Sequence, residues 1–206
     1  ISGEDYWCQG YSEPGAGSDL ASLQCKAERV GDEYVINGTK IWTTHAHLAN
    51  KIFCLVRTDN SGKNQEGITF LMLDMNQPGV KVEPILTMAK DHDFNQVVFT
   101  DAVAKVSDRI GEENQGWSVA KYLLEFERSG GIGGSKSLSD LDFIRRLIKK
   151  ISSTHKDSSF ADTYNTKVAE LEIKALSIQY TSLRILSSLT KGDSPGPESS
   201  MMKTLV

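Results

Sequence analysis

The chain has 206 residues, of which 39% are hydrophobic and 24% are charged, and its formal net charge is −4. This length can bury a substantial core in one large domain or two small ones, and the composition is that of an ordinary globular protein. The weak negative charge argues against a general nucleic-acid or membrane-surface binder. No apolar run approaches the roughly 20 residues that a membrane-spanning helix needs.

The three cysteines, Cys8, Cys25 and Cys54, are scattered and form no CxxC pair. This pattern favours reduced thiols over a disulfide framework or a zinc site, so we expect a cytoplasmic location. The first residues have neither the basic start nor the apolar core of a signal peptide. Because the chain begins without Met and stops without a terminal signal, we expect it to be a fragment.

The stretch Trp7–Asp19 contains three glycines and a proline, which predicts a tightly turning loop without regular helix or strand. Backbone N–H groups in such loops converge on anionic or carbonyl-rich ligands. Ser12 and Ser18 add hydroxyls, and Trp7 and Tyr11 add aromatic surface. Taken alone, the pattern is more typical of an ordinary surface turn.

Residues 20–107 predict a β-rich domain. Alternating apolar and polar residues mark the strands, and Asn37-Gly38 is a strong hairpin signal before Lys40. Short strands with frequent turns and no helical pattern between them predict an antiparallel β-barrel or sandwich. The expected strands are Leu23–Val30, Glu33–Ile36, Lys51–Arg57, Ile68–Asp74, Val80–Ile85 and Phe94–Phe99.

After residue 110 the pattern becomes helical, so we expect an α+β chain: a β-domain over 1–110 and a partial α-helical bundle over 111–206. The expected helices are Gln115–Gly130, Ser139–Ser152 with Ser139 as N-cap, and about Asp162–Thr190. The last helix carries apolar or small residues at alternating three- and four-residue spacing, a seam that must pack on another helix. The seam consists of Val168, Leu171, Ala175, Ile178, Ser182, Ile185 and Leu189.

Two histidines, His45 and His47, lie two apart and would share one face of a strand, as metal ligands do. No acidic or cysteine partner is nearby in sequence, so we expect no metal site. Lys40 is interpreted as a solvated charge at a strand end. Trp42, taken alone, is interpreted as a core aromatic residue of the β-domain.

Glu127 is the residue of the first helix with the most chemical interest. A carboxylate on an apolar stripe loses hydration, so its pKa should rise toward the range useful for a general base. A surface glutamate paired with Arg128 or Lys121 explains the same pattern. Glu125 and Arg128 fall off the stripe and are either solvated or touch the polar part of a ligand. The residues that share the face of Glu127 are Trp117, Ala120 and Leu124.

Three segments together resemble the acyl-CoA dehydrogenase family. They are Tyr11–Asp19, Asn37–Thr44, and Gly111–Trp117 at the opening of a helix, in the family's order. The resemblance covers nearly all of the chain. It implies the family's middle β-domain followed by the first C-terminal helices, with the N-terminal domain and the last helices missing.

The resemblance implies that FAD binds with its ring between the β-domain and the C-terminal helices. A flavin needs donors at its ring carbonyls and N5, a flat or apolar surface, and exclusion of water. Ser12 and Thr44 would lie at the N5/O4 edge, with Trp42 against the ring. The other cofactor-binding residues implied are Gln9, Gly10, Tyr11, Ser18 and Thr43, and the substrate-binding residues are Ser18, Glu125 and Arg128.

The family's reaction is the α,β-dehydrogenation of an acyl-CoA. A glutamate takes the α-proton as the β-hydride passes to flavin N5, and the electrons then leave to an electron-transfer flavoprotein. Two family positions are known for the glutamate: one matches Glu127, and the other lies beyond Val206. The resemblance also implies a homo-oligomer, a dimer or tetramer, formed through the C-terminal helices.

The chain departs from common family members in two places. His45-Ala46-His47 follows Thr44 where Asn or Ser with Gly is usual, and the Arg-x-x-Phe-Gly motif that serves FAD across the dimer is not evident. This is similar to a bacterial subgroup that acts on larger or unusual acyl-CoAs. The alternatives are an acyl-CoA oxidase or flavin monooxygenase on the same fold, or a catalytically silent β-domain with a helical dimerisation module.

Overall fold

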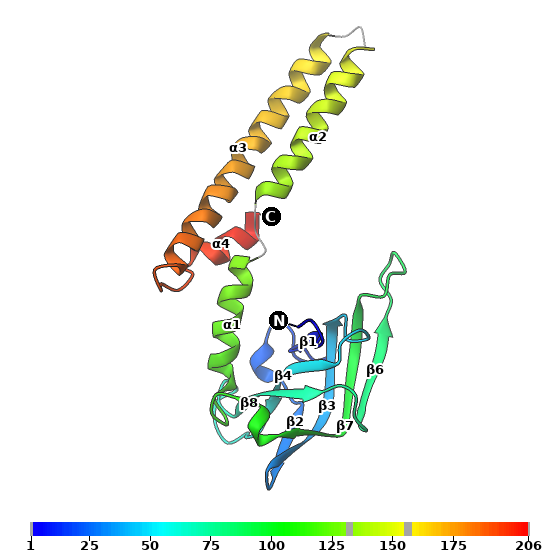
Figure 1. Ribbon diagram of the computed structural model, residues 1–206, viewed down its shortest axis with the longest axis vertical. Coiled ribbons are helices and arrows are strands. Elements are labelled where there is room, and N and C mark those ends of the chain that lie inside the picture. The colour runs from blue at the N-terminus through cyan, green and yellow to red at the C-terminus, as the bar shows by residue number, and fades with distance from the viewer. Residues whose placement is uncertain (1, 131–133, 155–157, 206) are drawn as a thin grey trace. The chain divides into compact units, whose positions relative to one another are not determined.

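The computed structural model describes residues 2–130, 134–154 and 158–205. The chain forms two compact units, a β unit (Ile1–Lys121) and a helical unit (Tyr122–Val206). The β unit contains one eight-stranded sheet, and the helical unit contains two long helices that lie side by side (Figure 1). This organisation confirms the predicted α+β fold class.

The sheet of the β unit has the strand order β6-β7-β3-β2-β4-β5-β8, and β1 pairs with β4. Most pairs are antiparallel, but β1 runs parallel to β4 and β2 meets β4 at one parallel pair. The predicted strands at 51–57, 68–74 and 80–85 are confirmed. The strands are β1 (Trp7–Gly10), β2 (Lys26–Val30), β3 (Glu33–Thr44), β4 (Lys51–Arg57), β5 (Ile68–Asp74), β6 (Val80–Ile85), β7 (Phe94–Lys105) and β8 (Arg109–Ile110), and 3₁₀ turns cover Leu20–Ser22 and Val106–Asp108.

The prediction of a hairpin at Asn37-Gly38 is wrong, because β3 continues through this pair. The pairing of β3 with β7 shifts register between Ile36 and Gly38, and the Asn37 amide bridges this irregularity by hydrogen bonds of 2.9 Å to Asp101. Gly38 is a glycine for another reason: a Cβ there would lie 2.7 Å from the Cα of Cys25. Close approach between backbones, not a turn, explains this residue.

Residues Trp7–Gly10 also differ from the sequence prediction, since they form strand β1 instead of an irregular loop. Gly10 is buried, and a Cβ there would meet atoms of Cys54 and Ile52 at 2.9 Å. The absence of a side chain at Gly10 therefore lets β1 pair closely with β4. The expected tight turn comes later, where Glu13 and Ala16 exchange two backbone hydrogen bonds of 2.9 and 3.0 Å.

The core of the β unit is a continuous apolar cluster that includes Tyr34, Ile36, Ile52 and Leu71, each fully buried. The alternation read from the sequence places these side chains on the inner face. The three cysteines are free and buried in the same unit. Burial raises the pKa of the Cys8 thiol to about 12 and that of Cys25 to about 11.

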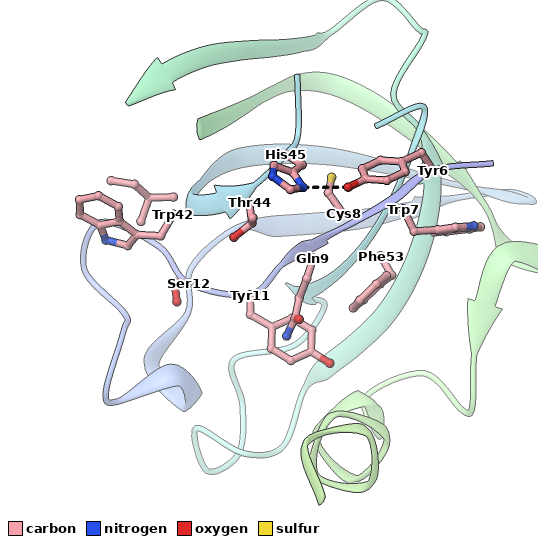
Figure 2. A pocket seen from close by; sticks show the side chains of 11 residues that line it. Tyr6, Trp7, Cys8, Gln9, Tyr11, Ser12, Trp42, Thr44, His45 and Phe53 are labelled. Carbon is pink, nitrogen blue, oxygen red and sulfur yellow. Dashed lines mark hydrogen bonds between the residues drawn. The ribbon is translucent and has the colours of Figure 1, made fainter. Parts of the chain in front are cut away.

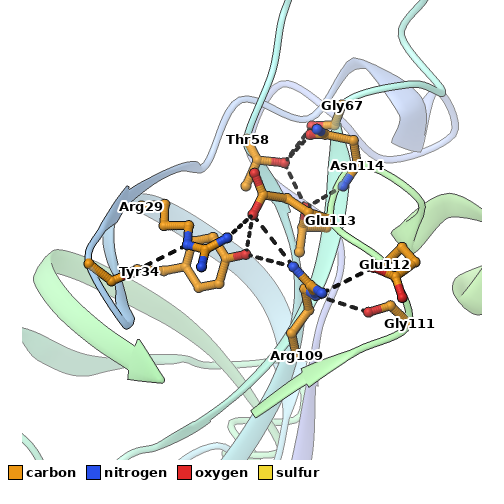
Figure 3. Close-up of polar contacts among 11 residues, drawn as sticks. Arg29, Tyr34, Thr58, Gly67, Arg109, Gly111, Glu112, Glu113 and Asn114 are labelled. Atoms are coloured by element: carbon orange, nitrogen blue, oxygen red, sulfur yellow. Dashed lines mark hydrogen bonds and ion pairs between the residues drawn. The ribbon is translucent and has the colours of Figure 1, made fainter. Parts of the chain in front are cut away.

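A polar cluster ties the segment before the first helix to the sheet (Figure 3). The Tyr34 hydroxyl donates to the Glu113 carboxylate at 2.5 Å, and Arg109 and Arg29 pair with the same carboxylate at 3.5 and 3.6 Å. Burial and the bond to Glu113 raise the pKa of Tyr34. The Asn114 backbone N–H donates to the Thr69 hydroxyl on β5 at 2.9 Å. These contacts fix the starting point of helix α1.

The helices are α1 (Gly116–Gly130), α2 (Gly134–Ser152), α3 (Ser158–Leu189) and α4 (Glu198–Leu205). Helix α2 begins at Gly134, so Ser139 lies inside it and the predicted N-cap is wrong. No proline or turn signal between these two residues stops the helix from starting earlier. None of the helices in the described part of the chain combines the length and apolarity that a membrane span requires.

The seam predicted on α3 is only partly buried. Val168 and Ala175 pack with Leu141 and Ile148 of α2, whereas Leu171 is 48% exposed. A single pair of helices buries only the narrow stripe that faces the partner helix. The apolar residues that flank this stripe stay exposed, among them Phe143, Leu147, Ile173, Leu183 and Leu186.

Candidate functional site

A pocket of about 410 Å³ opens in the β unit where β1, the end of β3 and β4 meet (Figure 2). Its volume lies in the range of small-molecule and cofactor sites. It gathers five of the predicted cofactor-binding residues, Gln9, Tyr11, Ser12, Trp42 and Thr44. The remaining lining residues are Tyr6, Trp7, Cys8, Ile41, His45 and Phe53.

The Ser12 loop and the end of β3 are joined directly, because the Ile41 N–H donates to the Ser12 carbonyl at 2.8 Å. Two stretches that lie about 30 residues apart in sequence are thereby held at one pocket. Within the described residues, the hydroxyls of Ser12 and Thr44 make no hydrogen bond to the protein, so both can serve a ligand. Ser12 and Thr44 therefore lie at the same pocket, as a shared binding site requires.

A buried ion pair stiffens this loop from behind. Lys40 is completely buried, and its Nζ lies 2.7 Å from the Glu13 carboxylate and 3.2 Å from the Tyr11 carbonyl. Glu13 also accepts hydrogen bonds from the backbone N–H groups of Gln24 and Cys25. The interpretation of Lys40 as a solvated charge is therefore wrong. Its side chain is buried and pairs with Glu13, a carboxylate 27 positions away in sequence that only folding brings close.

Trp42 is 58% exposed, which excludes its interpretation as a core aromatic residue. Its backbone has a positive φ of 59°, at a register shift of the β3–β7 pairing between Lys40 and Thr43. The indole meets the Phe94 ring edge-on at a centroid distance of 6.3 Å. The bulge thus turns Trp42 outward to the pocket and buries Thr43, whose Oγ1 has no hydrogen-bond partner in the described chain.

An aromatic cluster lines the side of the pocket formed by β4. Phe53 and Phe70 stack at 5.8 Å, and Tyr11 meets both rings edge-on at 6.1 and 6.3 Å. Phe53 was missed by the sequence reasoning. Alternation along Lys51–Arg57 would have identified it, since Phe53 lies on the opposite face from the buried Ile52 and Cys54.

His45 and Tyr6 contribute polar groups to the pocket and were likewise missed as a pair. The Tyr6 hydroxyl and His45 Nδ1 are 2.8 Å apart (Figure 2). His47 instead stacks on His92 at a centroid distance of 4.0 Å. In the described part of the chain, no three His, Cys, Asp or Glu side chains form a group able to hold a metal ion.

The other predicted site residues lie outside the lining. Gly10 is buried in β1 beside the pocket, and Ser18 is exposed on the loop that follows. Glu125 and Glu127 are exposed on α1, in the helical unit. The side chain of Arg128 lies outside the described residues. The desolvation of Glu127 expected from its apolar stripe remains a prediction.

The family model for the acyl-CoA dehydrogenase middle domain matches residues 8–102. The chain is 46% identical over 124 residues to the acyl-CoA dehydrogenase IpdE1 of Mycobacterium tuberculosis, covering 60% of this chain and 32% of the relative. It is 33% identical over 205 residues to FadE34 of the same organism, covering 100% of this chain and 28% of the relative. The chain therefore spans about a third of the length of these relatives.

Solved structures give the same likeness. A steroid acyl-CoA dehydrogenase variant, Tcur3481–Tcur3483 G363A, matches with a TM-score of 0.80 and 27% identity, over 99% of this chain and 52% of that chain. The ChsE4–ChsE5 complex from Mycobacterium tuberculosis matches with a TM-score of 0.78 and 29% identity, over 97% and 51%.

Proposed function

Because this chain belongs to the acyl-CoA dehydrogenase family, we propose that the protein is an FAD-dependent enzyme that introduces a double bond between the α- and β-carbons of an acyl-CoA thioester. The observation that carries the proposal is that Ser12, Trp42 and Thr44 line the same pocket. When bound, FAD would supply the acceptor for the β-hydride, and Ser12, Trp42 and Thr44 would hold its ring.

The pocket fits a flavin ring on three counts. Ser12 and Thr44 offer hydroxyls that are free for a ligand within the described chain. Tyr11 and Phe53 offer an apolar aromatic wall, and the exposed indole of Trp42 offers a flat surface for a ring system. This is the mixture of apolar walls and a few placed polar groups that cofactor sites use.

Glu127 is the residue that we propose as the general base for the α-proton. It is exposed on α1, a helix whose start is fixed by the polar cluster of Figure 3. Loss of water around its carboxylate in the substrate-bound protein would favour the proton-accepting role at neutral pH. Glu125, Arg128 and Ser18 are the groups that we assign to the substrate's CoA and acyl parts.

The steroid dehydrogenase among the similar structures makes a bulky acyl-CoA the first substrate class to test. We further propose a cytoplasmic homo-oligomer that passes electrons to an electron-transfer flavoprotein. The free, buried thiols support a reducing compartment, and the exposed apolar face of α2 and α3 supports assembly.

The test is anaerobic reduction of the flavin in the purified protein by steroid, branched and straight-chain acyl-CoAs, followed by absorbance. Glu127→Gln should bind flavin normally and lose the reduction by at least about 100-fold, the usual size of a general-base contribution. Glu170→Gln, which changes an exposed glutamate on α3 in the same way, is the matched control and should keep most of the rate. Purified protein without flavin absorbance, or an undiminished rate in Glu127→Gln, would contradict the corresponding assignment.

A further inference from the structure

Three side chains from separate segments meet at the rim of the pocket. The Tyr6 hydroxyl lies 2.8 Å from His45 Nδ1, and His45 Nε2 lies 3.8 Å from the Asp93 carboxylate. Tyr6 precedes β1, His45 follows β3 and Asp93 precedes β7. Tyr6 and His45 line the pocket, and His45 is the immediate neighbour of Thr44. The contacts Asp93–His45–Tyr6 therefore connect a carboxylate to the pocket.

Backbone contacts fix both ring-bearing residues. The Tyr6 N–H donates to the Asn50 side chain at 2.8 Å, and its carbonyl accepts from the Asn50 and Lys51 N–H groups at 3.1 and 3.2 Å. The His45 N–H donates to the Asp93 carbonyl at 2.7 Å. His45 has a positive φ of 56°, a backbone conformation uncommon for residues other than glycine.

The direction of the Tyr6–His45 hydrogen bond depends on one proton. Neutral His45 with the proton on Nε2 toward Asp93 accepts the Tyr6 O–H at Nδ1. Protonated His45 carries a hydrogen on each nitrogen, so Nδ1 donates and Tyr6 must accept. The phenol hydrogen is then free to donate to a ligand in the pocket. Both states keep both contacts, and only the donor that faces the pocket changes.

The neighbouring histidine, His47, has a hydrogen-bond partner other than His45. The edge of His47 faces the His45 ring at a centroid distance of 6.4 Å. The buried Asn95 amide donates to the Thr43 carbonyl, which orients it so that His47 Nδ1 accepts and His92 Nε2 donates. Asp93 is thus the carboxylate that pairs with His45.

Resting on the proposed function, we propose that His45 and Tyr6 are positioning residues for the bound flavin. A flavin that has accepted a hydride carries more negative charge than before. Protonated His45 places a positive charge and a free Tyr6 O–H at the rim of the pocket, and both favour that charge. Exposed pairs like His45–Asp93 contribute little in water, but a ligand that excludes water strengthens them.

The first experiment needs no flavin. The ring-nitrogen chemical shifts of the histidines are measured by NMR in the wild type, Asp93→Asn and Tyr6→Phe. Loss of the carboxylate should change the shift of His45 Nε2 and loss of the phenol that of His45 Nδ1, whereas Asp91→Asn, an exposed neighbour, should change neither. Unchanged His45 shifts in both Asp93→Asn and Tyr6→Phe overturn the chain of contacts Asp93–His45–Tyr6, whether or not the protein binds flavin.

The second experiment measures the flavin midpoint potential against pH, with flavin stoichiometry measured in parallel. His45→Asn and Tyr6→Phe should lower the midpoint potential at acid pH, while Tyr180→Phe, which changes an exposed tyrosine on α3, should leave it unchanged. Variants that bind flavin and superimpose on the wild type reject the role of these two residues. Absence of bound flavin in the wild type itself would reject the proposed function instead. The first experiment would still decide whether Asp93, His45 and Tyr6 are connected.

Discussion

The β unit and the helical unit differ in how much of their apolar side chains they bury. In the β unit, Ile36, Ile52 and Leu71 are fully buried, and even the polar pair Lys40 and Glu13 lies in the core. In the helical unit, large apolar side chains on α2 and α3 face solvent in this chain, Ile173 at 66% exposure among them. An eight-stranded sheet buries one whole face at once, whereas two helices bury only a stripe.

The two units therefore differ in how far their features depend on contacts within this chain. The β unit holds its pocket through contacts internal to it: the ion pair behind the loop, the bond from Ile41 to Ser12, and Gly10 against β4. The helical unit leaves a broad apolar face uncovered within this chain. The homo-oligomer through these helices stays a prediction. The experiments below test each half of the comparison, beginning with the largest effect.

Lys40→Met should destabilise the β unit by about 3–5 kcal/mol, because the buried Glu13 carboxylate loses its cation. Urea unfolding followed by tryptophan fluorescence measures the loss. Lys51→Met is the control, since it removes a partly exposed lysine paired with Asp74 and should change stability by about 0–1 kcal/mol. Equal losses in the two variants would mean that the Lys40 pair is no more important than a surface contact.

Ile148→Ala should destabilise the helical unit by about 2–5 kcal/mol, because the side chain is buried between α2 and α3. Ile173→Ala, on the exposed face of α3, should cost no more than about 0.5 kcal/mol in a monomer. Thermal unfolding followed by circular dichroism at several protein concentrations compares them. A large, concentration-dependent cost at Ile173 would show that this face is covered by another copy.

Gly10→Ala should destabilise the β unit by about 1–3 kcal/mol, because the new methyl group must displace Cys54 or Ile52. Gly15→Ala is the matched control in the same stretch, since nothing lies within 4 Å of the added carbon. Its stability should stay within about 0.5 kcal/mol of the wild type. A similar loss at both positions would point to backbone effects and away from the close packing of β1 on β4.

Alkaline pH should weaken the β unit more than the helical unit, which contains no cysteine. Burial raises the pKa of Cys8 to about 12 and of Cys25 to about 11, from an ordinary value of 9.0. The stability they contribute is complete below pH 9 and is lost between pH 9 and 12, because the unfolded thiols ionise first. Ionisation of each thiol should lower the free energy of unfolding by on the order of 1 kcal/mol at pH 10 relative to pH 8, measured by urea unfolding. Cys8→Ala should reduce that pH dependence, and an identical slope would contradict the assignment.

Much of the fold was predictable because its signals are local. Alternation and turn residues determined the strands at 51–57, 68–74 and 80–85, and helical periodicity determined α1 to within one residue at its start. The same signals failed at Asn37-Gly38, where a pair typical of a turn lies inside a strand. There the reason for a glycine is the distance to Cys25, a residue on another segment.

The site divides in the same way. The sequence by itself determined that Ser12, Trp42 and Thr44 belong to one family signature, because these short segments keep their residue types in order. Only the tertiary structure decided that Lys40 is buried against Glu13, and that Tyr6 and His45 share a hydrogen bond across 39 positions. Both pairings depend on which strands become neighbours, and a side chain's hydration and partners follow from that arrangement, not from its own sequence neighbours.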